Sequence, residues 1–182
     1  MGDRTYLKLT IHGHIPSLDA YNGITSAISQ ENLEPCLGGS HGGEFLRAIL
    51  DQDNPEFEHH ECNYADISSV EAVLQMHKVA YHIAHGDGAE YSAQCKSWTP
   101  EGDLFEEDTD SRGDPTIGLS DLIRARDNAA KEGYTFEAWV LARVDAMEKA
   151  SGKGLPSFTM ADEASAQFAK RIAKAALGLK AA

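Results

Sequence analysis

The topology of the chain depends on residues 44–51, which read Glu-Phe-Leu-Arg-Ala-Ile-Leu-Asp. As a strand, this segment turns every second side chain from Leu46 to Leu50 toward a core, because strand side chains alternate between two faces. As two helical turns, it instead places residues three or four positions apart on one face. The turn signal Asp53-Asn54-Pro55 follows, and residues 57–64 are extended in pattern. We therefore expect residues 44–64 to form a β-hairpin.

The segments on either side of this hairpin complete a layered pattern. Residues 6–12 alternate, with Leu7, Leu9 and Ile11 on one face, which predicts a strand. Apolar residues at helical spacing predict one helix over 17–31 and another from Ser68 to about residue 85. Residues 89–98 alternate again, with Tyr91, Ala93 and Cys95 toward the core, and a short acidic strand lies around residues 104–105.

Strand, helix, hairpin, helix and strand is the ferredoxin-like βαββαβ order. The expected fold is therefore α+β, an antiparallel sheet with two helices on one face. If residues 44–51 are helical instead, a layered α+β domain built around a βαβ-type unit remains.

The pattern after residue 116 contains helices only. Residues 111–116 read as a hinge, and helices are expected over about 117–132, 135–151 and 159–177, with Thr135 and Thr159 as N-caps. We therefore predict an acidic α+β domain over 1–110 and a helical segment over 117–182. These helices are expected to add a second partner contact or a homodimer interface.

Charge is the most unusual bulk property of the chain. The net charge is -13, and residues 1–148 carry 10 Lys or Arg against 27 Asp or Glu. Such an acidic domain repels phosphates, which disfavours direct nucleic-acid binding through the main domain.

The apolar stretches are too short for a membrane span, and the N-terminus lacks a secretory pattern. Three separated cysteines indicate free thiols in a reducing compartment. We expect a cytoplasmic protein that does not bind membranes.

The histidines offer one functional alternative, a metal-dependent enzyme. His12 and His14 are two residues apart on the first predicted strand, and so share a face. A neighbouring predicted strand holds His59, His60 and Glu61, which could complete a site with two histidines and one carboxylate. The sequence contains no HExxH pair, phosphate-binding lysine loop or nucleophile motif, so no catalytic residue or cofactor is predicted.

The open face of the predicted sheet offers a second alternative, RNA binding. Alternation places Tyr6, Lys8, Thr10 and His12 beside Ser92, Gln94, Lys96 and Trp98. Ferredoxin-like RNA-binding modules stack bases on aromatic side chains of this face. The same aromatic residues would also serve as anchors in a protein interface.

Acidic clusters support the leading hypothesis, a non-enzymatic protein that binds a partner with a basic surface. Such carboxylates can imitate a phosphate backbone, so the expected partner is a nucleic-acid-handling complex. Small acidic inhibitors of phages and mobile elements, of the anti-CRISPR or anti-restriction type, act in this way as a class. The predicted partner-binding residues are Glu101, Asp103, Glu106, Glu107, Asp108, Asp110, Asp51, Asp53 and Glu56, with Tyr6 and Trp98 as anchors. A third reading is an accessory subunit whose acidity only maintains solubility.

Overall fold

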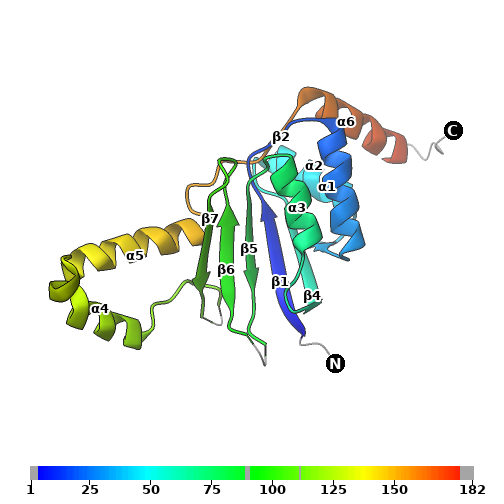
Figure 1. Cartoon of the computed structure of the whole chain (residues 1–182). Helices are drawn as coiled ribbons and strands as arrows, with labels where there is room; N and C mark the ends of the chain where they lie inside the picture. The colour runs from blue at the N-terminus through cyan, green and yellow to red at the C-terminus, as the bar shows by residue number, and fades with distance from the viewer. Residues whose placement is uncertain (1–3, 89–90, 111, 177–182) are drawn as a thin grey trace.

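The computed structural model describes residues 4–88, 91–110 and 112–176, which form a mixed α+β fold. Its main sheet has six antiparallel strands in the order β3-β4-β1-β5-β6-β7 (Figure 1). These strands are β1 (Arg4–Ile11), β3 (Glu34–Pro35), β4 (Glu56–Asn63), β5 (Tyr81–His85), β6 (Gln94–Trp98) and β7 (Leu104–Asp108). The predicted α+β class is confirmed. The ferredoxin-like order is not, because the sheet has more strands than a βαββαβ unit supplies.

The decisive segment 44–51 is helical, so the predicted hairpin is wrong. It belongs to α2 (His41–Asp51), which begins where the Ser40 hydroxyl accepts a hydrogen bond from the Gly43 amide, at 3.1 Å. The buried side chains of α2 include Phe45 and Ala48, three residues apart, which matches helical rather than strand periodicity. Phe45 packs against Phe57 of β4 with ring centroids 5.4 Å apart. The serine cap lies within the glycine-rich segment 38–43.

The second predicted helix is also too long. Helix α3 (Ser68–Met76) ends before Lys78, whose φ of 55° breaks the helical path. The chain then enters β5, in which Tyr81 and Ile83 are fully buried. Tyr81 and Ala84 therefore belong to a strand, although their spacing from Leu74 also fits a helical stripe.

One face of the sheet carries the main core. Helix α1 (Leu18–Gln30) contributes Tyr21, Ile24 and Ile28, and β1 contributes Leu7, Leu9 and Ile11, all of them buried as predicted. Helices α2 and α3 join α1 on this side, whereas α5 packs on the opposite face at β6 and β7. The sheet is thus covered on both faces at different places.

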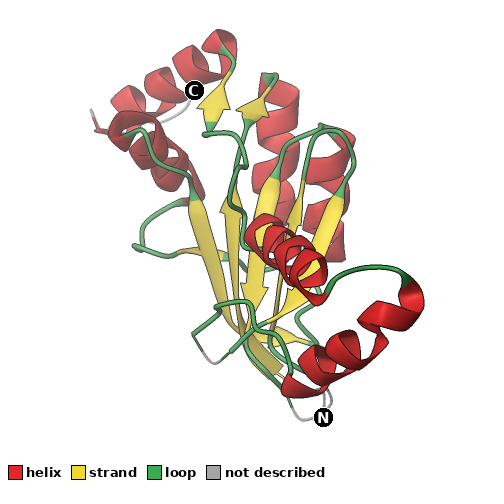
Figure 2. Ribbon diagram, turned by 90° about the vertical axis from the view of Figure 1, so that its left-hand side faces the viewer, coloured by secondary structure: helices red, strands yellow, loops and turns green. Residues whose placement is uncertain are grey.

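The C-terminal segment contains two predicted helices and a third that begins later than predicted. Helix α4 (Leu119–Glu132) ends at Gly133, and α5 (Phe136–Ala150) begins at the Thr135 cap, both as expected. Together they form a hairpin beyond β7, and this hairpin points toward the viewer in Figure 2. Thr159 does not cap a helix, because it lies in β8 (Thr159–Met160), which pairs in parallel with β2 (His14–Ile15).

The last helix, α6 (Asp162–Ala176), lies against the main core. Phe168 packs on Tyr21 with ring centroids 5.3 Å apart and is buried together with Phe158 and Met160. The domain boundary at residues 111–116 stays a prediction, and Leu179 of the predicted helical stripe lies outside the described residues. Among the helices of the described residues, none has the length and apolar character needed to cross a membrane.

Candidate partner-binding surface

The tip of the β6–β7 hairpin projects two acidic side chains. Its turn is closed by hydrogen bonds from the Thr99 amide to the Asp103 carbonyl, at 3.0 Å, and from the Gly102 amide to the Thr99 carbonyl, at 2.9 Å. Gly102 adopts a φ of 99°, which glycine tolerates without strain. Glu101 and Asp103 are exposed, and neither forms an ion pair within the described residues. The turn therefore holds two exposed carboxylates at this tip, and neither has an ion-pair partner among the described residues.

Two further carboxylates lie along β7 on a shared face. Glu106 pairs across the ladder with Lys96, and Asp108 pairs with Gln94, whose amide donates to the Asp108 carboxylate at 3.2 Å. Both carboxylates belong to exposed residues on the α3 side of the sheet. Residues two apart on a strand point to the same face, so Glu106 and Asp108 share one. The rise of a strand separates two such residues by roughly 6.8 Å.

Glu107 points to the opposite face and is withdrawn from solvent. It is 6 % exposed and forms a two-point ion pair with Arg143 of α5, one contact of which is 2.5 Å long. Burial raises the pKa of its carboxyl, whereas the Arg143 guanidinium opposes that rise. This carboxylate therefore fastens α5 to the sheet and is not displayed to a partner.

Asp110 shapes the chain after β7. Its carboxylate accepts hydrogen bonds from the backbone amides of Arg112, at 2.8 Å, and Asp114, at 3.1 Å. These bonds, together with the Arg112 guanidinium, lower the pKa of Asp110. Asp110 therefore stabilises a turn, and its charge is already matched by a neighbouring cation.

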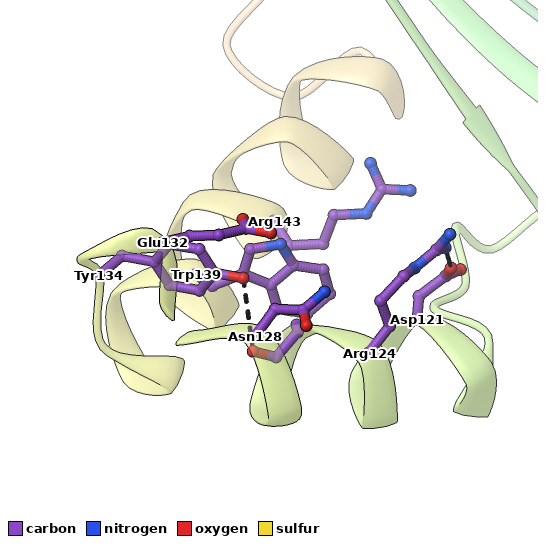
Figure 3. A pocket seen from close by; sticks show the side chains of 8 residues that line it. Asp121, Arg124, Asn128, Glu132, Tyr134, Trp139 and Arg143 are labelled. Carbon is purple, nitrogen blue, oxygen red and sulfur yellow. Dashed lines mark hydrogen bonds and ion pairs between the residues drawn. The ribbon is translucent and has the colours of Figure 1, made fainter. Parts of the chain in front are cut away.

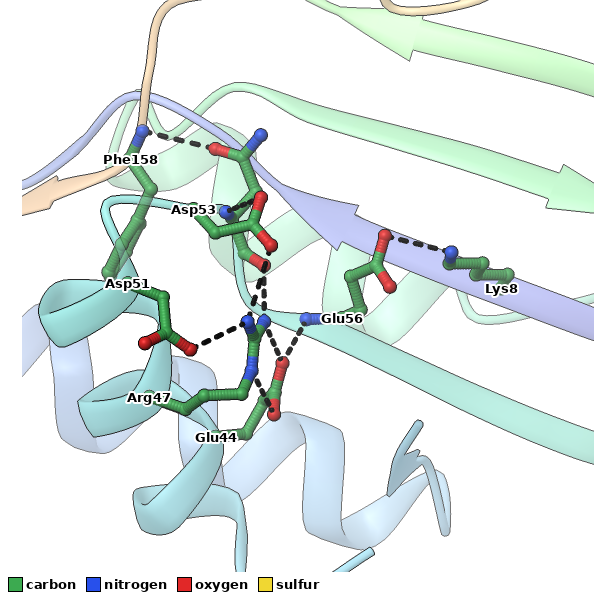
Figure 4. Close-up of polar contacts among 8 residues, drawn as sticks. Lys8, Glu44, Arg47, Asp51, Asp53, Glu56 and Phe158 are labelled. Atoms are coloured by element: carbon green, nitrogen blue, oxygen red, sulfur yellow. Dashed lines mark hydrogen bonds and ion pairs between the residues drawn. The ribbon is translucent and has the colours of Figure 1, made fainter. Parts of the chain in front are cut away.

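The second predicted acidic group is largely neutralised within the chain (Figure 4). Arg47 forms ion pairs with Asp51 at 3.6 Å and Asp53 at 3.2 Å. It also contacts the buried carboxylate of Glu44 at 2.8 Å. Glu56 pairs with Lys8 at 2.8 Å. This network ties α2 to the start of β4, so these carboxylates have a structural role.

The two acidic groups lie at the same end of the sheet but on different strands. Glu56 is opposite Thr10 near the end of β1, and Leu104 is opposite Trp98 at the end of β6. Strands β1, β5 and β6 separate β4 from β7. Four interstrand steps correspond to roughly 19 Å. A single flat partner surface would therefore have to span most of the sheet to contact both groups.

A cleft of about 410 Å³ opens beside Glu106. At its wall the Lys96 ammonium contacts the Glu71 carboxylate at 2.8 Å, and the hydroxyl of the fully buried Tyr81 donates to the same carboxylate at 2.8 Å. Burial and this carboxylate raise the pKa of Tyr81 well above its usual value. Asp66 also lines the cleft, so its walls carry more negative than positive charge. Sequence reasoning missed the pairing because it assigned Tyr81 to a helix.

The two predicted aromatic anchors differ in accessibility. Tyr6 is 42 % exposed, and its hydroxyl donates to Glu58 at 3.1 Å. Burial and this carboxylate raise the pKa of Tyr6 to about 12. Trp98 is only 8 % exposed and stacks on Tyr81 with ring centroids 6.0 Å apart, so it cannot serve as a surface anchor.

The predicted open face is also assembled differently. Leu9 is opposite Ile83, and Ile83 is opposite Lys96, so Lys96 lies on the core side of the sheet and not beside Lys8. Gln94 and Trp98 lie on the same side as Lys96, whereas Cys95 lies on the side of Lys8. The aromatic platform expected of an RNA-binding module is therefore absent from the described residues.

The histidines of the metal alternative do not converge. His12 follows the end of β1, whereas His14 is in β2, where its Nδ1 is 2.9 Å from the Thr159 hydroxyl. His59 is opposite Leu7, several residues along the sheet from His12. The described residues contain no group of three or more His, Cys, Asp or Glu side chains that could hold a metal ion. The predicted set of His12, His14, His59, His60 and Glu61 is therefore not brought together.

Comparison with known proteins identifies no relative, because no family model, curated protein or solved structure matches the chain.

Proposed function

We propose that this protein is a non-enzymatic binding protein that engages a basic surface of a partner through its β6–β7 acidic surface. We define this surface as Glu101, Asp103, Glu106 and Asp108. The observation that carries the proposal is that all four are exposed and form no ion pair within the described residues. Other acidic residues of the predicted interface, such as Asp53, Glu56 and Glu107, already have cationic partners.

The arrangement suits electrostatic recognition because its charges are fixed in place. The antiparallel ladder between β6 and β7 holds Glu106 and Asp108 on one face, and the turn holds Glu101 and Asp103. Like charges held this close repel one another, and a cationic partner relieves that repulsion. Surface charges of this kind raise association rates and are screened by salt.

The partner class we propose is a nucleic-acid-handling protein or complex with a basic groove. Such grooves are built to hold regularly spaced anions, and the chain as a whole carries a net charge of -13. An inhibitor encoded by a phage or mobile element, of the anti-CRISPR or anti-restriction type, is one concrete form of this function. The cleft at Lys96 and Glu71 lies next to Glu106 and could receive one basic side chain of the partner.

A charge-reversal comparison tests the proposal. One variant replaces Glu101, Asp103, Glu106 and Asp108 with lysine. The matched control replaces Glu34, Asp87, Glu137 and Glu163, which are also exposed and also lack ion pairs within the described residues. Both variants change the net charge equally, so only the position of the charge differs between them.

Binding is measured against purified basic nucleic-acid-binding proteins and an arginine-rich peptide, at low and at high salt, with nucleic acid as competitor. We expect the β6–β7 variant to lose binding and the control variant to keep most of it. Nucleic acid should displace the wild-type chain. Equal loss in both variants would show that net charge alone is responsible, and binding that is insensitive to salt would favour a plain accessory subunit.

A further inference from the structure

A cleft lies where four segments of the chain meet at one end of the main sheet. Ile11, Tyr81, Trp98 and Leu104 are aligned across β1, β5, β6 and β7 and mark that end. The segment after β1, the residues between α3 and β5, and the β6–β7 turn therefore gather there (Figure 1). The stretch that leads into β8 is the fourth segment. Together they line a cleft of about 650 Å³.

Backbone contacts hold two sides of this cleft together. Strand β2 pairs in parallel with β8, which sets His14 opposite Thr159. The Gly13 amide donates to the Pro156 carbonyl at 3.0 Å, and the Thr159 amide donates to the Gly13 carbonyl at 2.7 Å. Gly13 has a φ of 74°, and a Cβ added there would lie 3.2 Å from Pro156 Cγ. Glycine permits both the backbone angle and the close approach, so the cleft is formed by the fold itself.

Apolar side chains make up most of the cleft surface. Pro16, Pro100 and Pro156 contribute rings from three of the segments, and Met76 at the end of α3 is 69 % exposed. A cleft of this size with an apolar lining and a few polar groups is the usual form of a small-molecule site. A ligand with an apolar body would remove these side chains from water, which favours binding.

The ionisable groups of the cleft can only be neutral or positive. They are His14, His77 and Lys78, and no Asp or Glu of the described residues lines the cleft. Lys78 is exposed, and its ammonium group forms no ion pair within the described part of the chain. This is unusual in a chain with 29 Asp or Glu against 16 Lys or Arg. The cleft therefore presents an unneutralised cation beside an apolar surface.

Two other cavities of the protein contain carboxylates. The cavity of about 400 Å³ lined by α4 and α5 has two arginines, but also Asp121 and Glu132 (Figure 3). Glu101 follows Pro100 in the β6–β7 turn, yet it lines a different cavity, together with Lys149. The positive character of the cleft at Lys78 is therefore a local feature, and it determines which ligand charge the cleft accepts.

Two side chains of the cleft can donate hydrogen bonds to an anion. Lys78 has a φ of 55°, and its amide donates to the Gln75 carbonyl at 3.0 Å, which fixes the backbone that carries the ammonium group. His14 Nδ1 is 2.9 Å from the Thr159 hydroxyl. When that hydroxyl donates to Nδ1, the proton of the neutral ring is on Nε2, which can then donate to a ligand.

We propose that this cleft binds a small organic anion with an apolar body, of the medium-chain carboxylate class. The apolar body lies on Met76 and the proline rings, and the carboxylate accepts hydrogen bonds from Lys78 and His14. Hydrogen bonds between two charged groups are stronger than those between neutral groups, so the charge of Lys78 selects an anion. The cleft shares no residue with the β6–β7 acidic surface, so this inference is independent of the proposed function.

Titration of the wild-type chain with octanoate, followed by nuclear magnetic resonance, tests the site. We expect saturable shifts at backbone amides within residues 13–16, 76–78 and 156–159. Octanamide has the same apolar chain without the charge, and it should bind at least about tenfold more weakly. Octylamine should cause no shifts at these amides. Hexanoate should bind more weakly than octanoate, by about fourfold for each buried CH₂ that it lacks.

Three variants separate the contribution of charge from that of apolar surface. Lys78→Gln should weaken octanoate binding about tenfold and leave octanamide binding unchanged, because it removes only the charge. Lys131→Gln is the matched control, since Lys131 is also exposed, forms no ion pair within the described residues and lies outside the cleft. It should bind octanoate as the wild-type chain does. Met76→Ser should weaken the binding of octanoate and octanamide alike.

Several results would overturn the proposal. One is the absence of saturable octanoate shifts at the cleft amides. Another is octanamide or octylamine binding there as tightly as octanoate. A third is equal octanoate affinity of Lys78→Gln and Lys131→Gln. Circular dichroism checks that each variant is folded, and the comparison of ligands needs only the wild-type chain.

Discussion

His82 makes the stability of the fold depend on pH in a defined window. The side chain lies on the sheet face that carries Lys8, and a Cβ added at Gly152 would lie 3.2 Å from the His82 ring. His82 Nε2 is buried without a hydrogen-bond partner among the described residues, and so is Nδ1 of the nearby His12. Burial, His12 and Lys8 together lower the pKa of His82 to about 4. Burial also lowers the pKa of His12, although the Pro156 backbone carbonyl, Glu56 and Asp53 oppose that effect.

The sign of the effect follows from proton binding. The unfolded chain binds a proton at His82 near pH 6.5, whereas the folded chain does so only near pH 4. The contribution of neutral His82 to the free energy of unfolding is therefore fully present above pH 6.5, and it is lost as the pH falls toward 4. At 1.36 kcal/mol for each pKa unit, the full loss is about 3 kcal/mol, and about 2 kcal/mol of it appears between pH 7 and pH 5.

Urea unfolding at pH 7 and pH 5 measures this loss. His82→Phe replaces the ring with one that does not titrate, so its stability should change much less between the two pH values. His60→Phe is the control, because His60 is 70 % exposed, and it should keep the full pH dependence. The reasoning is refuted if His82→Phe and the wild-type chain lose the same stability. It is also refuted if nuclear magnetic resonance shows the His82 ring titrating near pH 6.5 in the folded protein.

Three further variants test how the fold is held together. Glu44→Ala removes a buried carboxylate that binds Arg47 and the Glu56 amide, and we expect urea unfolding to show a loss of about 3 kcal/mol. Phe168→Ala removes the α6 ring that packs on Tyr21 and should cost about 3 kcal/mol; no change would mean that α6 does not contribute to the core. Gly152→Ala should lower the melting temperature, because its φ is 81° and the new Cβ would meet His82. Gly154→Ala shares the positive φ but meets nothing within 4 Å, so it should have the smaller effect.

The sequence predicted elements well where one periodicity dominated. Leu7, Leu9 and Ile11 alternate without ambiguity, and they are buried on one face of β1. The α4 and α5 helices were identified from their stripes and caps, because Thr135 and Gly133 give local signals that need no tertiary context. These elements are defined by interactions within a few residues of the chain.

The wrong assignments arose where the spacing of apolar residues fitted both a strand and a helix. Residues 44–51 contain apolar residues that suit either a strand or a helix, and the outcome was decided by Phe45 packing on Phe57. The stripe from Val70 to Ala84 continued helical spacing through Lys78, where the backbone turns left-handed. That misassignment moved Tyr81 from strand to helix and hid the cleft at Lys96 and Glu71. In both cases a contact with a distant residue accompanies the observed structure, because Phe45 packs on Phe57 and Tyr81 stacks on Trp98.

The candidate site was predictable as composition but not as geometry. The carboxylates of residues 101–108 were recognised from the sequence, but alternation along β7 separates Glu106 from Glu107. The ion pair between Glu107 and Arg143 joins residues 36 positions apart, and no sequence pattern indicates it. The pairing of Arg47 with Asp53 likewise depended on α2 being a helix.

Residue-specific binding measurements test the proposed function most directly. Nuclear magnetic resonance spectra of the wild-type chain are recorded during titration with an arginine-rich peptide, at low and at high salt. We predict that the largest shifts occur at the amides of Glu101, Asp103, Glu106 and Asp108, and that they disappear at high salt. Shifts centred elsewhere, for example at Asp51 and Asp53, or no saturable shifts at low salt, would contradict the proposal that the β6–β7 acidic surface binds a basic partner.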